Sequence, residues 1–198
     1  MPSTMIHLLT AYKYNPNASA AFWVGNVAPD SIYERKEKDK SHLRDRPDRA
    51  KALEEFALSM DLKDDLNQGI IMHLYLDYCW DIDPMHNFIQ NYKEGFWFPV
   101  YRNEIALAGA WLYHHVDWSK KIWDEMLALP MSAYEHVQGL KKEAIFDFIE
   151  RNSKWHAESN IGPSSAFPPD FVEEFSSKAA VDFKNWFNKI INKSENKN

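Results

Sequence analysis

Apolar residues recur at helical spacing along almost the whole chain, and the alternation typical of β-strands is scarce. This pattern predicts a protein built from α-helices. The first two expected helices cover residues 4–14 and 17–25. A third begins near Pro47, a residue suited to a first helical turn, and a long apolar helix covers residues 61–80.

The C-terminal half continues the same periodicity. Its expected helices cover residues 84–92, 99–115, 118–129, 133–156 and 169–192. Residues 27–46 are instead polar and irregular, and the Gly- and Pro-rich stretch 161–169 is typical of a loop. We therefore predict an all-α fold with a single multi-helix domain over residues 1–192, and a frayed tail over residues 193–198.

Composition narrows the class of protein. The chain has 198 residues with 8 Trp, 9 Tyr and 12 Phe, enough for an aromatic-rich core in one domain. A net charge of -6 does not favour nucleic acid as a partner. Cys79 is the only cysteine, so no intrachain disulfide forms. Neither a secretory leader nor a membrane-spanning apolar run is visible, and we expect a cytoplasmic protein.

The most informative motif is a histidine and an aspartate four residues apart, His73 and Asp77, inside the long apolar helix. At this spacing the two side chains lie on the same side of a helix, one turn apart. A buried carboxylate needs a partner of opposite charge, and a divalent metal ion is the simplest partner for both groups. Gly69, one turn earlier, would leave room for the ion, and Trp80 would wall the pocket.

Three more residues of the ligand type precede this helix: His7, Asp30 and His42. Each has an ordinary interpretation when taken alone. His7 would be a hydrogen-bonded core histidine, Asp30 would cap a turn after Pro29, and His42 would be a solvated side chain in a charged loop. Their joint occurrence before one apolar helix that itself carries a His–Asp pair favours a metal site.

These motifs follow one another in a recognisable order. They are His7, then Gly25-Asn26-Val27-Ala28-Pro29-Asp30, then Ser41-His42, then the run from Gly69 to Trp80. The series resembles the bacterial zinc-dependent phospholipase C family, whose fold is shared by the fungal single-strand-specific nucleases. The resemblance covers residues 4–80 and continues loosely through the following helices.

The resemblance implies a zinc cluster held between helices, although iron or another divalent metal remains open. Asp30, His42 and His73 would hold one ion, and Asp77 would bridge to a second ion bound by His7. The implied activity is hydrolysis of a phosphoric ester, as in a phosphodiesterase, with a small phosphate ester or a phospholipid as substrate. The metal would lower the pKa of a bound water, and Asp30 would orient that water as general base.

The chain departs from the family pattern at the third metal ion. The family uses its processed N-terminal amine and an H-x-x-x-E pair, and no such pair occurs here. His86, Glu104, His114 and His115 are possible substitute ligands but do not match the family's order, so we expect one or two ions. His114 and His115 are typical of a helix C-terminus, where they complement the helix dipole.

Two alternatives to a hydrolase stay open. The first is a non-catalytic, metal-stabilised helical domain that serves binding, and the second is a metal-free helical scaffold. An open coordination position distinguishes a catalytic ion from a structural one. Two further sets of residues have ordinary interpretations: a solvated loop for Lys40, Arg44 and Arg46, and core packing for Phe22, Trp23, Phe96, Trp97 and Phe98.

Overall fold

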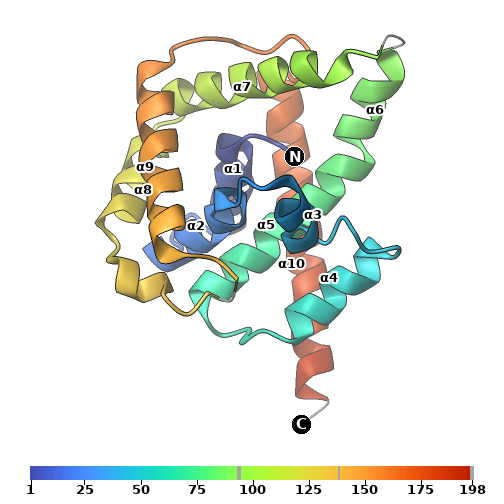
Figure 1. Ribbon diagram of the computed structural model, residues 1–198, viewed down its shortest axis with the longest axis vertical. Helices are drawn as coiled ribbons and strands as arrows, with labels where there is room; N and C mark the ends of the chain where they lie inside the picture. The colour runs from blue at the N-terminus through green and yellow to red at the C-terminus, as the bar shows by residue number, and fades with distance from the viewer. Residues whose placement is uncertain (93–94, 138, 197–198) are drawn as a thin grey trace.

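The computed structural model describes residues 1–92, 95–137 and 139–196, and within these ranges the chain forms helices and no strands. The predicted all-α fold is confirmed. None of the described helices is long and apolar enough to cross a bilayer. The elements in Figure 1 are α1 (Thr4–Tyr14), α2 (Ala20–Val27), η1 (Ala28–Ser31), α3 (Arg35–Ser41), α4 (Arg49–Leu58), α5 (Asp65–Ile82), α6 (Pro84–Asn91), α7 (Trp97–His115), α8 (Ser119–Ala128), η2 (Met131–Tyr134), α9 (Lys142–Glu158) and α10 (Pro169–Glu195).

Helix α5 is the central element of the domain. Its N-terminus is capped by Asp64, whose carboxylate accepts a hydrogen bond from the backbone N–H of Asn67 at 2.9 Å. Apolar residues occur on all its faces, so α5 is enclosed by its neighbours. It contacts α1, α2, α4 and α10, and Figure 1 shows it running through the middle of the molecule.

Helices α2 and α5 approach each other so closely that their backbones touch. A Cβ atom on Gly69 would lie 2.2 Å from the carbonyl oxygen of Phe22, and one on Gly25 would lie 2.1 Å from that of Leu66. Only glycine fits at either position. The expectation that Gly69 makes room for an ion is therefore wrong, because this residue faces the α2 backbone. Its role is to bring the end of α2 against His73.

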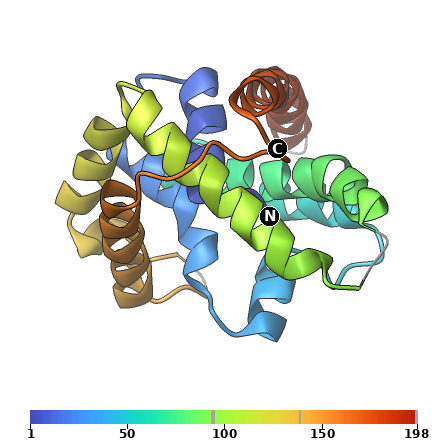
Figure 2. The same ribbon diagram turned by 90° about the horizontal axis from the view of Figure 1, so that it is seen from above.

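Helix α7 lies across the end of the molecule at which the chain begins (Figure 2). The indole N–H of Trp80 in α5 donates to the hydroxyl of Tyr101 in α7 at 2.8 Å. Trp80 also packs against Phe167 and Phe175, with ring centroids 5.2 and 4.9 Å away. It therefore joins α5 to α7 and α10, and does not wall the metal pocket as expected.

Three boundaries differ from the sequence prediction. Helix α3 forms within the stretch expected to be irregular; it has no buried residue, so hydrophobic periodicity cannot reveal it. The helix expected over residues 133–156 is divided into η2 and α9, and Gly139 between them has a left-handed φ of 81°. Helix α10 continues to Glu195, so the predicted tail is helical at its start, while residues 197–198 lie outside the described part of the chain.

Candidate metal centre

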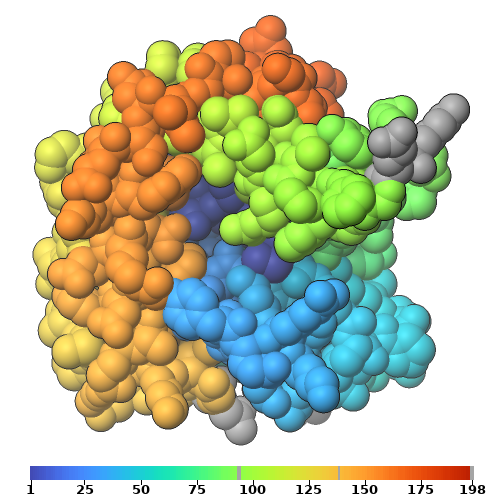
Figure 3. Space-filling model, turned by 45° about the horizontal axis from the view of Figure 1, so that its top comes forward, coloured from blue at the N-terminus to red at the C-terminus, as the bar shows by residue number. Residues whose placement is uncertain are grey.

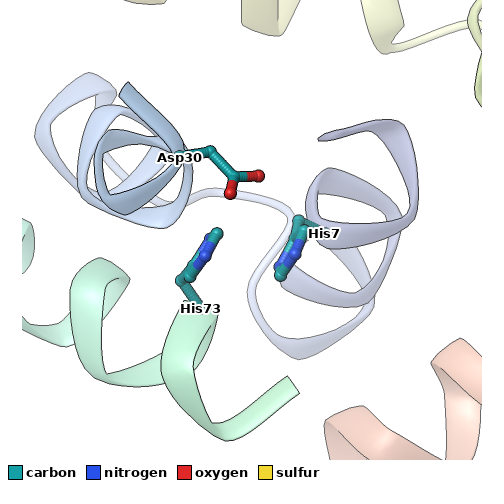
Figure 4. Close-up of side chains that lie close together, drawn as sticks. All are labelled: His7, Asp30 and His73. Atoms are coloured by element: carbon teal, nitrogen blue, oxygen red, sulfur yellow. The ribbon is translucent and has the colours of Figure 1, made fainter. Parts of the chain in front are cut away.

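Five buried polar side chains meet next to α5. They come from α1 (His7), η1 (Asp30), the C-cap of α3 (His42) and α5 itself (His73 and Asp77), and each is at most 7% exposed. Figure 4 shows three of them, His7, Asp30 and His73, pointing toward one another from three elements. The structure thus brings together all five residues that the sequence suggested as metal ligands.

His42 and His73 are held in the same tautomer by backbone carbonyl groups. The Nδ1 atom of His42 lies 2.8 Å from the oxygen of Lys38, and that of His73 lies 2.8 Å from the oxygen of Asn26. Because a carbonyl oxygen only accepts, each Nδ1 carries the proton and donates it. In its neutral form, a ring held in this way presents a lone pair at Nε2, the arrangement found in histidines that bind metals.

These two Nε2 atoms lie only 3.2 Å apart. Two lone pairs at that distance repel each other unless a proton or a cation lies between them. The Oδ2 atom of Asp77 is 3.5 Å from Nε2 of His42 and 4.0 Å from Nε2 of His73. A carboxylate and two imidazole lone pairs therefore surround the same small volume.

His7 completes the group from the side of α1. Its ring stacks on that of His73, with centroids 4.0 Å apart and planes 5° from parallel. Neither ring nitrogen of His7 has a hydrogen-bond partner among the described residues, although Nε2 lies 3.5 Å from Oδ1 of Asp77. Buried polar atoms without partners are rare, so these nitrogens mark a position where an ion or water is needed.

Two overlapping triads have ligand atoms within 4.8 Å of one another: His7, Asp30 and His73, and His42, His73 and Asp77. Both triads could hold a metal ion. His73 belongs to both, and only one of its ring nitrogens is free because Nδ1 is bonded to Asn26. The two triads therefore cannot each bind an ion through His73 at the same time.

Each carboxylate has a cationic partner. Asp30 Oδ1 lies 2.8 Å from Lys38 Nζ, and Asp77 Oδ2 lies 2.8 Å from Arg44 Nη2. Burial by itself would raise the pKa of Asp30, but contact with His42 and the charge of Lys38 hold that pKa well below its usual value. The pKa of Asp77 is likewise low despite burial, with contact from His7 the largest opposing cause. Both groups are carboxylates at neutral pH.

The imidazole of His73 is uncharged at neutral pH. Burial, reinforced by the nearby ring of His7, lowers its pKa to about 3. Burial therefore disfavours a proton on Nε2 of His73. A neutral imidazole is the form that binds a metal ion, so the state of His73 suits that role.

Arg44 lies beside the centre, which the sequence interpretation did not predict. It was expected in a solvated loop, but its guanidinium bridges Asp77 and Asp81, with Nε 3.0 Å from Asp81 Oδ2. Arg49 contacts the same Asp81 oxygen at 2.8 Å. The signal was present in the chain, because Asp81 follows Asp77 by one helical turn and two adjacent carboxylates require cations. Arg46, by contrast, is exposed as expected.

Two clefts reach this centre from the surface. One has a volume of about 380 Å³ and includes Asp30 and Lys38 in its lining. The other has a volume of about 740 Å³ and is lined by Lys38, Arg44 and Asp81. Phe98, which borders the second cleft, is 57% exposed, so its expected place in the core is wrong. Asp30 is thus the candidate ligand that lines the first cleft, whereas the second cleft is bordered by Arg44, the ion-pair partner of Asp77.

The four residues considered as substitute ligands lie elsewhere. His86 is exposed on α6 and bonded to Gln90. Glu104 Oε2 accepts hydrogen bonds from Ser164 Oγ and from the N–H groups of Ser165 and Ala166, so it anchors the loop before α10. His114 and His115 are the last residues of α7, which confirms the prediction of a C-terminal pair. Among the aromatic residues, Phe22 and Trp23 are buried as expected, whereas Phe96 is 81% exposed.

No protein-family model, no curated protein and no solved structure matches this chain.

Proposed function

We propose that this protein is a metal-dependent hydrolase of phosphoric esters and that zinc is its ion. The observation that carries the proposal is the pair of Nε2 atoms of His42 and His73, 3.2 Å apart, each fixed as a lone-pair donor by a backbone carbonyl. Two imidazoles with one or two carboxylates form a ligand set typical of zinc, with iron as an alternative. The order of motifs that resembles the zinc-dependent phospholipase C family supports the same activity.

We infer one ion, held by His42, His73 and Asp77 and approached by Asp30 and His7. The two triads share His73, and its single free nitrogen serves one ion at a time because the other nitrogen is bonded to Asn26. Arg44 already supplies a positive charge beside Asp77. We therefore propose a single ion at this triad.

The residues around the ion have distinct roles in the proposed reaction. When bound, the metal supplies a water of lowered pKa and a positive charge for the phosphate oxygens. Asp30, a carboxylate that lines the cleft of about 380 Å³, accepts a hydrogen bond from that water and orients it. Lys38 and Arg44 lie beside the two carboxylates, where their charges stabilise a phosphate dianion.

The cytoplasmic location of the protein stays a prediction.

The contacts of Lys38 and Arg44 also favour a second candidate function. Lys38 and Arg44 already balance the negative charges of the two carboxylates, so these carboxylates do not require a metal ion as a partner. A non-catalytic helical binding domain would use the same residues as a buried polar network. The two functions differ in whether a metal binds and whether an ester is then hydrolysed.

Elemental analysis of protein purified without chelator or a polyhistidine tag tests the proposal. We expect one equivalent of zinc in the parent protein and loss of zinc in His73→Ala and Asp77→Ala. His86→Ala is the matched control, since His86 is exposed on α6 and bonded to Gln90. Zinc-loaded protein should hydrolyse bis(p-nitrophenyl) phosphate or p-nitrophenyl phosphate, and chelation should remove the activity.

Absence of metal from the parent protein, even after zinc is added, would contradict the hydrolase. Stoichiometric zinc without hydrolysis of either ester would instead support the binding domain.

A further inference from the structure

The smaller of the two clefts has a floor built from the beginning of α1. We call it the α1 cleft, and its lining includes Ser3, Thr4, Asp30, Arg102 and Arg151. Figure 3 shows this hollow with dark blue N-terminal residues at its base, between α7 in green and α9 in orange. Because Asp30 is also a candidate metal ligand, the α1 cleft opens directly onto the metal centre.

The α1 cleft is positively charged although the protein carries a net charge of -6. Its cationic lining residues are Lys38, Arg102 and Arg151, and Asp30 is the only acidic residue in the lining. Lys38 pairs with Asp30. Within the described ranges, no carboxylate lies within ion-pair distance of the guanidinium of Arg102 or Arg151. Among the residues that the structure describes, these two cations therefore have no acidic partner.

The two arginines stand on different helices on either side of the cleft. Arg102 belongs to α7 and Arg151 to α9. The Arg151 guanidinium lies over the ring of Tyr33, 4.9 Å from its centroid, and its Nε donates to the carbonyl of Asp147. These contacts fix Arg151 beside the opening and leave its remaining N–H groups for a ligand.

The floor adds further groups suited to an anion. Ser3 caps α1, and the first backbone N–H groups of a helix have no partner within the helix. They carry the positive end of the helix dipole, which favours an anion at this position. The α1 terminus and the two arginines thus present positive charge from three sides of one cavity.

His156 gives an independent indication of a missing ligand. It lines the α1 cleft and is only 2% exposed. Its Nδ1 donates to the carbonyl oxygen of Asn152 at 2.7 Å, so Nε2 carries a lone pair, and this buried Nε2 has no hydrogen-bond partner among the described residues. A hydroxyl group or a protonated phosphate oxygen of a ligand would supply the donor that Nε2 lacks.

We propose that the α1 cleft binds a second anionic group of the substrate, so that the enzyme acts on small phosphate esters carrying at least two anionic groups. The inference rests on the proposed hydrolase function, in which the scissile phosphate lies at the metal centre. Arg102 and Arg151 bind the second anionic group in the α1 cleft, which meets the metal centre at Asp30. A zwitterionic ester such as phosphocholine, whose cationic group would face these arginines, is a poor ligand for the cleft.

Calorimetric titration of metal-free protein tests the cleft separately from catalysis. The probe is inorganic pyrophosphate, with phosphocholine as the comparison. We expect pyrophosphate to bind at least tenfold more tightly than phosphocholine. Arg102→Gln and Arg151→Gln should each weaken pyrophosphate binding by about tenfold, the loss expected for a charge-assisted hydrogen bond. Arg46→Gln is the matched control, because Arg46 is exposed beside Asp45 and outside the cleft.

Equal binding of the two probes would overturn the inference, and so would pyrophosphate binding that is unchanged in both arginine variants. Either result would contradict the cleft assignment even if zinc-loaded protein hydrolyses esters. The proposed hydrolase activity would then be retained without the anion site. Arginine-dependent pyrophosphate binding in a protein that never takes up metal would support the anion site and remove the proposed activity.

Discussion

The Nε2 atoms of His42 and His73 face each other at 3.2 Å, while the opposite nitrogen of each ring donates to a main-chain carbonyl. This relationship joins a histidine at the end of α3 to one in the middle of α5. It makes both rings acceptors at the same point, which is a costly arrangement for a protein without a cation there. The structure therefore favours an occupied centre, and the predictions below follow from how its neighbours are arranged.

Arg44→Gln should destabilise the metal-free protein and strengthen zinc binding. Arg44 contacts both Asp77 and Asp81 and is 21% exposed. We expect a loss of about 2 kcal/mol in the free energy of unfolding, less than for a fully buried ion pair. Without the guanidinium, Asp77 attracts zinc more strongly, and the dissociation constant should fall by about tenfold. Urea unfolding and zinc titration measure the two effects, with Arg46→Gln as control. Weaker zinc binding in Arg44→Gln would show that Arg44 arranges the ligands instead of competing with the ion.

The stability of the metal-free protein should fall as the pH is lowered from about 6.5 toward 4. Burial lowers the pKa of His73 to about 3 and that of His156 to about 4, from an ordinary value of 6.5. In this window the unfolded chain binds protons that the folded protein does not, so acid favours unfolding. Each histidine contributes about 1.4 kcal/mol per pH unit. Urea unfolding at a series of pH values measures the slope, and a flat profile down to pH 4 would contradict it.

Gly69→Ala should disrupt both the fold and the metal centre. The added methyl group would lie 2.2 Å from the backbone oxygen of Phe22, and a backbone atom cannot move aside as a flexible side chain can. We expect a loss of about 3 kcal/mol in the free energy of unfolding. Zinc should bind more weakly, because α2 can no longer hold its Asn26 carbonyl against His73. Thermal unfolding and zinc titration test this, and Gly95→Ala, which has no atom within 4 Å of the new methyl group, is the matched control.

Glu104→Ala should loosen the loop before α10 without changing the zinc content. The Glu104 carboxylate accepts three hydrogen bonds from residues 164–166. Burial raises the pKa of Glu104, but these hydrogen bonds lower it further, so the pKa lies below its ordinary value. We expect a loss of about 1 kcal/mol, since the freed N–H groups are exposed to water. Elemental analysis should give the parent stoichiometry. Loss of zinc in this variant would show that Glu104 acts on the centre after all.

The helical fold and the residue types of the centre follow from local patterns in the amino-acid sequence. The 3.6-residue periodicity located most helices, and the His73–Asp77 spacing placed two ligands on one face, because both properties are local. Helix α3 and the break at Gly139 were missed, since one lacks a buried face and the other depends on a single left-handed residue.

How the candidate ligands contact one another depends on the packing of helices that are distant in the chain. Backbone carbonyls of Lys38 and Asn26 accept hydrogen bonds from the two histidines, and Arg44 bridges Asp77 and Asp81. The unpartnered nitrogen of His156 likewise depends on how α9 packs. No periodicity records such contacts. They arise because α2 and α5 touch at two glycines and because α7 and α9 enclose the beginning of α1, so packing sets the chemistry of the site.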